Sequence, residues 1–109
     1  MLLGAAIILT GMASLAAADP PADLRQFWEK NCASCHGVDG KADTKAGKKI
    51  GAINFSEAKN QEKFSDEQMF QSIKDGVKDK EGRFTMKPAE NVTDEQIKSL
   101  VAYVRAFKK

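Results

Sequence analysis

The sequence predicts an all-α domain in which three to four helices are joined by long loops. Segments 64–77 and 92–109 carry the capping residues and the apolar spacing of amphipathic helices. Valine and isoleucine are few and do not alternate with polar residues, so we expect no sheet. The connections at 37–60 and 77–91 are long for so small a domain, which indicates that they wrap around something.

The N-terminal segment has a composition of its own. Residues 1–18 are largely apolar and carry no charge, and the chain then becomes charged and polar. The run ends in three alanines, and small residues in this place are typical of a secretory signal and its cleavage site. We therefore expect residues 1–18 to be a cleaved signal peptide and residues 19–109 to form one domain. An uncleaved membrane anchor is the alternative, because ~18 apolar residues can just span a bilayer.

The first helix of the domain is expected to begin at the change in composition. Asp19 can serve as its N-cap, and Pro20 suits the first helical position because proline lacks the N–H that would be unsatisfied there. The helix would continue through Phe27 and Trp28 toward Cys32.

The second helix has a complete start signal. Ser65 is the expected N-cap, and Gln68 three residues later completes a capping box. Phe64 and Met69 occupy the two positions of a hydrophobic staple, and Gly76 is placed to end the helix.

The last helix shows the same pattern. Thr93 is the expected N-cap and Gln96 completes the capping box. An apolar stripe follows at helical spacing, formed by Ile97, Leu100, Val101, Val104 and Phe107.

The segment from Cys32 to His36 contains both cysteines and the only histidine of the chain. Its pattern, C-x-x-C-H, is the attachment motif for c-type haem. Two thiols about one turn apart can each add to a vinyl group of the porphyrin, and the adjacent imidazole can bind the iron. We therefore predict one covalently bound haem c, held by Cys32, Cys35 and His36, with His36 as an iron ligand.

Three other chemistries could use the same residues. Cys32 and Cys35 could form an ordinary disulfide, which is common in exported proteins. A redox-active C-x-x-C of the thioredoxin kind calls for a neighbouring βαβ pattern, which the sequence does not show. A structural zinc site usually has four ligands, and no further Cys or His is available.

The second axial position of a haem iron needs another ligand, and methionine is a common one. The chain has four methionines. Met1 and Met12 lie in the expected signal peptide, and Met69 is better explained by core packing. Met86 remains, in a loop outside any helical stripe and followed by Pro88. We therefore predict Met86 as the second iron ligand.

The chain resembles the class I c-type cytochromes, which are small monohaem electron carriers. The resemblance extends along essentially all of residues 19–109 and rests on an aromatic before "CASCHG", a Met-x-Pro loop and the final "VTDEQIKSLVAYVRAF". It implies the cytochrome c fold, with the first and last helices crossing and Trp28 packing near Leu100 and Tyr103.

Two positions depart from that family. Leu24 stands where the family often has a glycine that allows a close helix crossing, so a wider crossing is expected. The family also usually has a proline soon after the haem motif, near the carbonyl that accepts the histidine N–H, and none occurs between Cys32 and Lys87. We expect the backbone of segment 50–54 to accept the hydrogen bond of the His36 N–H instead.

The predicted function follows from the ligands. An iron held by both His36 and Met86 has no open position for a substrate, so we predict a six-coordinate one-electron carrier in the periplasm and not an enzyme. Its expected partners are redox proteins, such as a membrane cytochrome complex, an oxidase or a periplasmic dehydrogenase. A net charge of +2 from 17 basic and 15 acidic side chains, with the signs well mixed, argues against nucleic acid. We also expect a monomer without a small-molecule substrate.

Two alternative functions belong to other classes. If Met86 did not hold the iron, a five-coordinate haem could bind a diatomic gas or peroxide. If no haem were attached, the chain could be a periplasmic thiol–disulfide oxidoreductase that uses Cys32 and Cys35, and the protein would be colourless.

Overall fold

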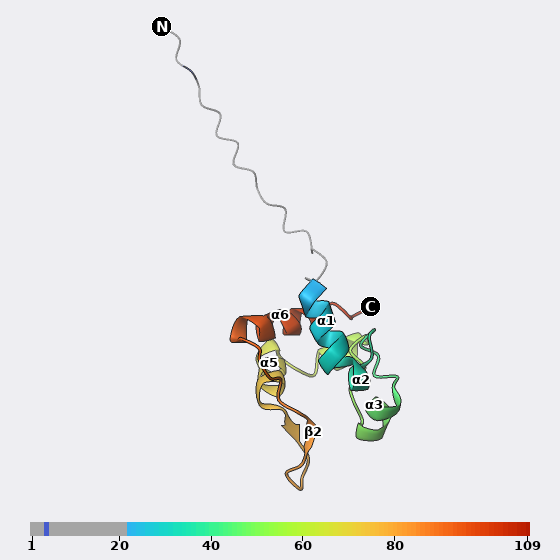
Figure 1. Cartoon of the computed structure of the whole chain (residues 1–109). Coiled ribbons are helices and arrows are strands. Elements are labelled where there is room, and N and C mark those ends of the chain that lie inside the picture. The colour runs from blue at the N-terminus through green and yellow to red at the C-terminus, as the bar shows by residue number, and fades with distance from the viewer. Residues whose placement is uncertain (1–3, 5–21) are drawn as a thin grey trace.

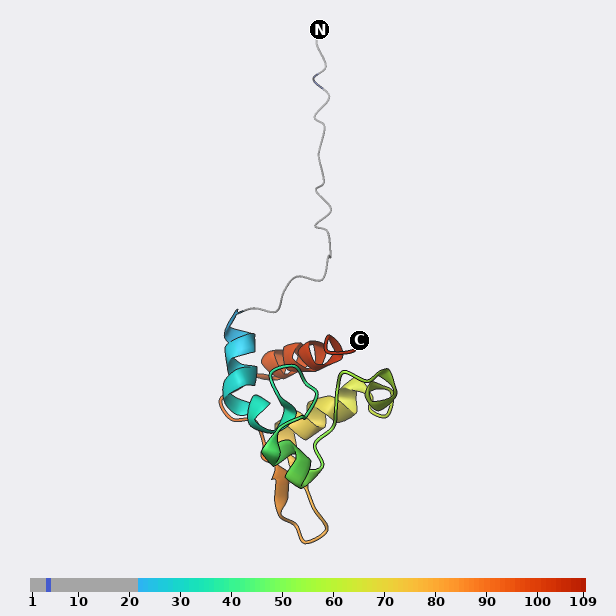
Figure 2. The same cartoon turned by 90° about the vertical axis from the view of Figure 1, so that its right-hand side faces the viewer.

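The computed structural model describes residue 4 and residues 22–109 of the chain (Figures 1 and 2). Within this part, six helical segments and one antiparallel pair of strands follow one another. They are α1 (Ala22–Asn31), α2 (Ala33–His36), α3 (Lys45–Ile50), α4 (Ala58–Gln61), α5 (Asp66–Asp75), β1 (Val77–Lys78), β2 (Phe84–Met86) and α6 (Asp94–Arg105). None of the helices in the described residues has the length and apolar character needed to cross a membrane.

Helices α5 and α6 begin as their sequences predict. In α5 the Ser65 side chain accepts a hydrogen bond from the N–H of Gln68, and the Gln68 side chain accepts one from the N–H of Ser65. Thr93 and Gln96 form the same reciprocal pair at the start of α6. Gly76 ends α5 with a positive φ of 76°. Both capping boxes are therefore confirmed, because a cap depends only on residues that are neighbours in sequence.

The core forms where α6 packs against α1 and α5, an arrangement visible in both cartoon views (Figures 1 and 2). Trp28 of α1 is buried in one cluster with Met69 of α5 and with Val101 and Val104 of α6. The Trp28 ring lies 5.4 Å from that of Tyr103, centroid to centroid. The expected contact between the first and last helices is therefore confirmed.

The expectation that the chain has no sheet is wrong. β1 pairs with β2, with Val77 opposite Met86. The turn between the strands is built by Asp79, whose carboxylate accepts hydrogen bonds from the N–H groups of Glu81 and Arg83. Strands of two and three residues are too short to show an alternating pattern in the sequence, which is why the pairing escapes a periodicity argument.

The expected number of helices is also too low. Segment 37–60, predicted as a loop, contains the short helix α3 and all but the last residue of α4. Thr44 caps α3 by accepting a hydrogen bond from the N–H of Gly47. In the last helix, the helical part ends at Arg105, so Phe107 lies beyond it, but its ring still packs on Trp28 at 5.1 Å between centroids.

The predictions for the N-terminal segment fall largely on residues that the structure does not describe. Asp19 and Pro20 lie outside the described residues, and so does the expected signal peptide at 1–18, apart from residue 4. Helix α1 is described from Ala22.

Candidate functional site: an apolar cavity at the C-x-x-C-H motif

The motif lies where α1 passes into α2. Cys32 precedes α2, and Cys35 and His36 are the last two residues of that helix. The backbone N–H of His36 donates to the Cys32 carbonyl at 3.0 Å, so the motif forms a single tight turn. Both cysteines are free thiols rather than a disulfide. The turn therefore presents two thiols and an imidazole within one short segment.

Helix α3 holds this turn in place through the carbonyl of Cys35. The Thr44 hydroxyl donates to that carbonyl at 2.8 Å. A side chain at Gly47 would meet the same carbonyl oxygen, so the close approach of α3 to the motif requires glycine there. On the other side, the Trp28 indole N–H donates to the Gly37 carbonyl at 2.9 Å. The motif is thus fixed by contacts from both α1 and α3.

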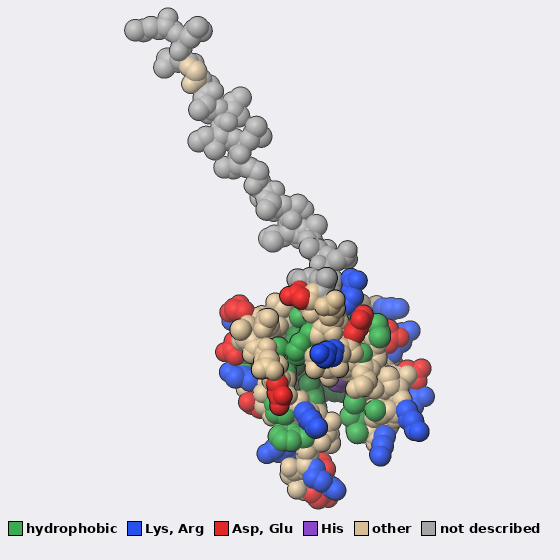
Figure 3. Space-filling view, in the orientation of Figure 1, with side chains coloured by type: hydrophobic (Ala, Val, Ile, Leu, Met, Phe, Trp, Pro, Cys, Tyr) green, Lys and Arg blue, Asp and Glu red, His purple; other side chains and the backbone are tan. Residues whose placement is uncertain are grey.

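A cavity of about 310 Å³ opens beside the motif. Cys32 and His36 line it from the turn of the motif, and Met86 lines it from β2. Most of the other lining residues are apolar, and Val77 among them is 39% exposed, so the cavity reaches the surface. Figure 3 shows hydrophobic side chains on both sides of a hollow on this face. Its volume lies at the lower end of the ~300–1,000 Å³ range of ligand pockets.

The predicted site residues do not all meet in this cavity. Cys32, His36 and Met86 line it, whereas Cys35 does not. Met69 lines it as well, from α5. The sequence places Met69 in the core, and its 7% exposure agrees, yet the same side chain also reaches the cavity. Two methionines are therefore candidates for an iron ligand on position alone.

The His36 imidazole is enclosed by two aromatic rings. Its centroid lies 5.0 Å from that of Phe55, with the planes 29° apart, and 5.8 Å from that of Trp28. Burial lowers the pKa of His36, and the nearby backbone of Ile53 opposes this with a smaller raising effect. The ring is therefore neutral at pH 7, with a lone pair available for a metal.

The Nδ1 atom of the His36 ring differs from the other buried side-chain polar atoms of the described residues in its hydrogen bonding. Among the described residues, Nδ1 of His36 is the one buried side-chain polar atom that has no hydrogen-bond partner. Ile53 lies within the 50–54 segment expected to orient the ring, and its backbone influences the pKa of His36, but it does not meet hydrogen-bond geometry with Nδ1. A buried polar group without a partner calls for a specific explanation, such as strain, a functional role or a bound water or ion.

Cys32 has the opposite chemistry from a redox thiol. Burial raises the pKa of its thiol to about 11. Reactive C-x-x-C thiols owe their activity to a lowered pKa, because the thiolate is the nucleophile. A raised thiol pKa at Cys32 does not favour thiol–disulfide exchange.

The residues present fit a haem. The cavity has an apolar lining, two free thiols lie on the adjoining turn, and a neutral imidazole and two thioethers reach the interior. Phe55, the aromatic that stacks on His36, is not predicted from the sequence. No local pattern marks it, because its contact with His36 is made by a loop that returns from α3.

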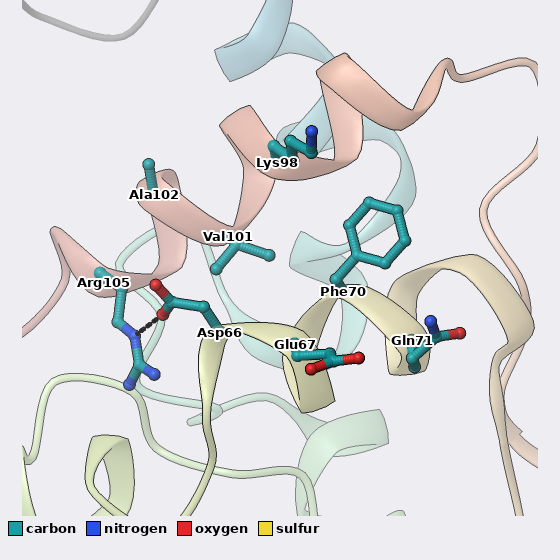
Figure 4. A pocket seen from close by; sticks show the side chains of 8 residues that line it. All are labelled: Asp66, Glu67, Phe70, Gln71, Lys98, Val101, Ala102 and Arg105. Carbon is teal, nitrogen blue, oxygen red and sulfur yellow. Dashed lines mark hydrogen bonds and ion pairs between the residues drawn. The ribbon is translucent and has the colours of Figure 1, made fainter.

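A second cavity, of about 620 Å³, lies between α5 and α6 (Figure 4). None of the predicted site residues lines it. Phe70 and Val101 form part of its wall. Nε of Arg105 donates a hydrogen bond to Oδ1 of Asp66 at 2.8 Å, and both residues line the cavity. The thiols and the histidine of the C-x-x-C-H motif do not line this second cavity.

The fold and the site together define a c-type cytochrome. A family model described as "Cytochrome C oxidase, cbb3-type, subunit III" matches residues 19–104. The chain belongs to this family. The predicted resemblance, the cytochrome c fold and covalently bound haem c with its iron are thereby confirmed.

Solved structures agree with this assignment. The chain is similar to "KustC0563 c-type cytochrome", with a TM-score of 0.65 and 40% identity over 78% of this chain and 96% of that one. It is also similar to a tyrosine-to-phenylalanine mutant of that cytochrome, with a TM-score of 0.64 and 39% identity over 79% of this chain and 99% of that one. No match was found among the curated proteins.

Proposed function

We propose that this haem-based electron carrier binds its haem through Cys32 and Cys35 and holds the iron with His36 and Met86. The observation that carries the proposal is that His36 and Met86 line one cavity although they come from elements far apart in the sequence, α2 and β2. Cys32 lines the same cavity, so a covalent anchor and two potential iron ligands meet there.

The side chains around this cavity have the chemistry that a one-electron carrier needs. When bound, haem supplies the one-electron couple of its iron. His36 is kept neutral by burial and so can act as a ligand. The Met86 thioether raises the reduction potential, and the apolar lining adds to this effect by excluding water. If His36 and Met86 both held the iron, no open position would remain for a substrate, so we propose a carrier rather than an enzyme.

The partners and the compartment follow from the family. Its description names a subunit of cbb3-type cytochrome c oxidase, which supports a membrane redox complex as the electron-exchange partner of this chain. Attachment of c-type haem and the apolar segment 1–18 support export, with a cleaved signal and a periplasmic domain.

Binding of carbon monoxide to the reduced protein tests six-coordination. We expect little change in the absorption spectrum at low carbon monoxide concentration, because Met86 occupies the position that the gas would take. Tight stoichiometric binding would instead support a five-coordinate haem and a gas- or peroxide-binding function. A reversible one-electron redox titration should accompany the weak gas binding.

A further inference from the structure

The polar residue Gln61 is placed unusually. It is 3% exposed, and within the described part of the chain it is the one polar or charged residue that is buried. A buried amide is costly unless its donors and acceptor are satisfied. Such a residue, in a small apolar core, needs a specific reason for its position.

Every polar atom of the Gln61 side chain has a partner. Its Nε2 donates to the carbonyls of Phe55 and Val104, both at 2.8 Å. Its Oε1 accepts from Nη1 of Arg105 at 3.1 Å. The amide therefore joins the loop before α4 to the last turn of α6, and its bond to Val104 links residues 43 positions apart in the sequence.

The contact with Phe55 leads to the predicted iron ligand. The backbone of Phe55 is held at both ends, since its N–H donates to the Gly40 carbonyl at 2.8 Å and its carbonyl accepts from Gln61. Its ring stacks on His36 at 5.0 Å between centroids. The backbone of Phe55 thus cannot shift without breaking one of these two hydrogen bonds.

We propose that Gln61 is a positioning residue for His36: by tying the backbone of Phe55 to α6, it fixes the ring that stacks on the imidazole. This inference rests on the proposed function of His36 as an iron ligand. Groups that orient a metal-bound histidine from outside commonly tune the metal. Here the orienting contact is an aromatic face, in a chain where Nδ1 of His36 lacks a hydrogen-bond partner.

Arg105 of α6 holds Gln61 and the chain that follows it through further hydrogen bonds. Its Nη1 donates to the Gln61 carbonyl and its Nη2 to the Phe64 carbonyl, both at 2.6 Å. Its Nε pairs with Asp66 at the edge of the second cavity (Figure 4). Asp66 therefore belongs to the same network but makes no hydrogen bond to Gln61 or Phe55, which makes it a suitable control position.

The test uses the oxidised holoprotein and reads the orientation of the imidazole. The paramagnetic NMR shifts of the haem methyl groups depend on the plane of the axial histidine. We expect Gln61→Met, which keeps the size of the side chain and removes its amide, to change the pattern of these shifts and the reduction potential. Phe55→Leu should change the pattern too. The double variant should differ little from Phe55→Leu alone, because both changes act through one contact.

Control variants separate this role from a merely structural one. Asp66→Asn should leave the methyl pattern as in the wild type. Gln61→Glu keeps the acceptor for Arg105 but loses both donors, so it should reproduce the shift even if Gln61→Met does not mature. A lower melting temperature with an unchanged methyl pattern and potential in a Gln61 variant would overturn the proposal.

The same spectra show which inference fails. A wild type whose spectra show no axial histidine would contradict the proposed function itself. A wild type with an axial histidine, whose methyl pattern is unaffected by the Gln61 variants, would contradict only the role of Gln61.

Discussion

Two methionines reach the cavity beside His36, and they differ in what else they do. Met69 is buried in the cluster of Trp28, Val101 and Val104, so its side chain already has packing partners. Met86 is half-buried at the end of β2, and the core cluster does not include it. The Met86 thioether has no such packing role in the core cluster, which favours Met86 as the iron ligand.

Replacing Met86 should therefore change the iron chemistry. In Met86→Leu the thioether is lost while the volume is nearly kept. We expect the reduced variant to bind carbon monoxide tightly and its reduction potential to fall, because methionine ligation raises the potential. A gas titration and a redox titration measure both effects.

Met69→Leu is the matched control for this experiment. It makes the same change in the same cavity and should cost less than ~1.5 kcal/mol of stability, as volume-conserving core changes do. Carbon monoxide binding should stay as weak as in the wild type. If Met69→Leu opened the iron to the gas and Met86→Leu did not, the ligand assignment would be wrong.

At the scale of elements, the β1–β2 hairpin determines where Met86 lies. Gly76 joins α5 to β1 with φ +76° and ψ −179°, a conformation that is essentially limited to glycine. A Cβ on Gly76 would lie 2.6 Å from the Met86 carbonyl oxygen and 2.8 Å from Cδ of Pro88. The base of the hairpin thus packs directly on the backbone of the proposed ligand.

We expect Gly76→Ala to disturb both stability and ligation. Strain of this kind costs ~1–3 kcal/mol, and the contact with Met86 adds to it. The free energy of unfolding should fall by at least this amount, and carbon monoxide binding to the reduced protein should increase. Denaturant titration and gas titration of the same sample measure the two effects.

Gly82 at the tip of the hairpin provides the comparison. It also has a positive φ, of +78°, but a Cβ there would meet nothing within 4 Å. Gly82→Ala should therefore cost only about 1 kcal/mol of backbone strain and leave gas binding unchanged. Equal effects of the two substitutions on gas binding would show that the hairpin base does not position Met86.

The elements that the sequence predicts correctly have local signals. The capping boxes of α5 and α6 and the C-x-x-C-H motif each depend on residues within a few positions of one another. The helix α3 is shorter than two helical turns, and the strands of the hairpin are shorter than one alternating run. Neither element therefore shows a periodic pattern in the sequence. A D-x-x-G turn signal at Asp79 to Gly82 is the one local indication of the hairpin.

The supporting residues of the site could not be predicted in this way. Gln61 looks like an ordinary polar residue of a helix, and its partners Val104 and Arg105 reach it only through the tertiary fold. Phe55 likewise gains its role from stacking on His36. Such roles depend on long-range contacts, and no spacing in the sequence encodes them.

At the scale of the whole molecule, the apolar cavity interrupts the core. Helices α1, α5 and α6 each contribute side chains that line the cavity, among them Trp28, Met69 and Leu100. Without the cavity these side chains would share one interior. A domain this small buries a limited fraction of its surface and gains much from a cofactor. The bound haem is therefore expected to be part of the core.

The chain without haem should be largely unfolded. The apolar faces of the helices would lose their common packing partner, and burial is worth ~25 cal/mol per Å² of apolar surface. Circular dichroism of the polypeptide produced without haem attachment measures this. Full helical content together with a cooperative melt would contradict the expectation.

The intact mass of the protein, purified from the exporting compartment and measured under denaturing conditions, tests the central claim most directly. Denaturation removes haem that is not covalently bound, so only thioether attachment at Cys32 and Cys35 would survive. We predict the mass of residues 19–109 plus one haem. The mass of the bare polypeptide, or one two hydrogens lighter from a Cys32–Cys35 disulfide, would contradict the account.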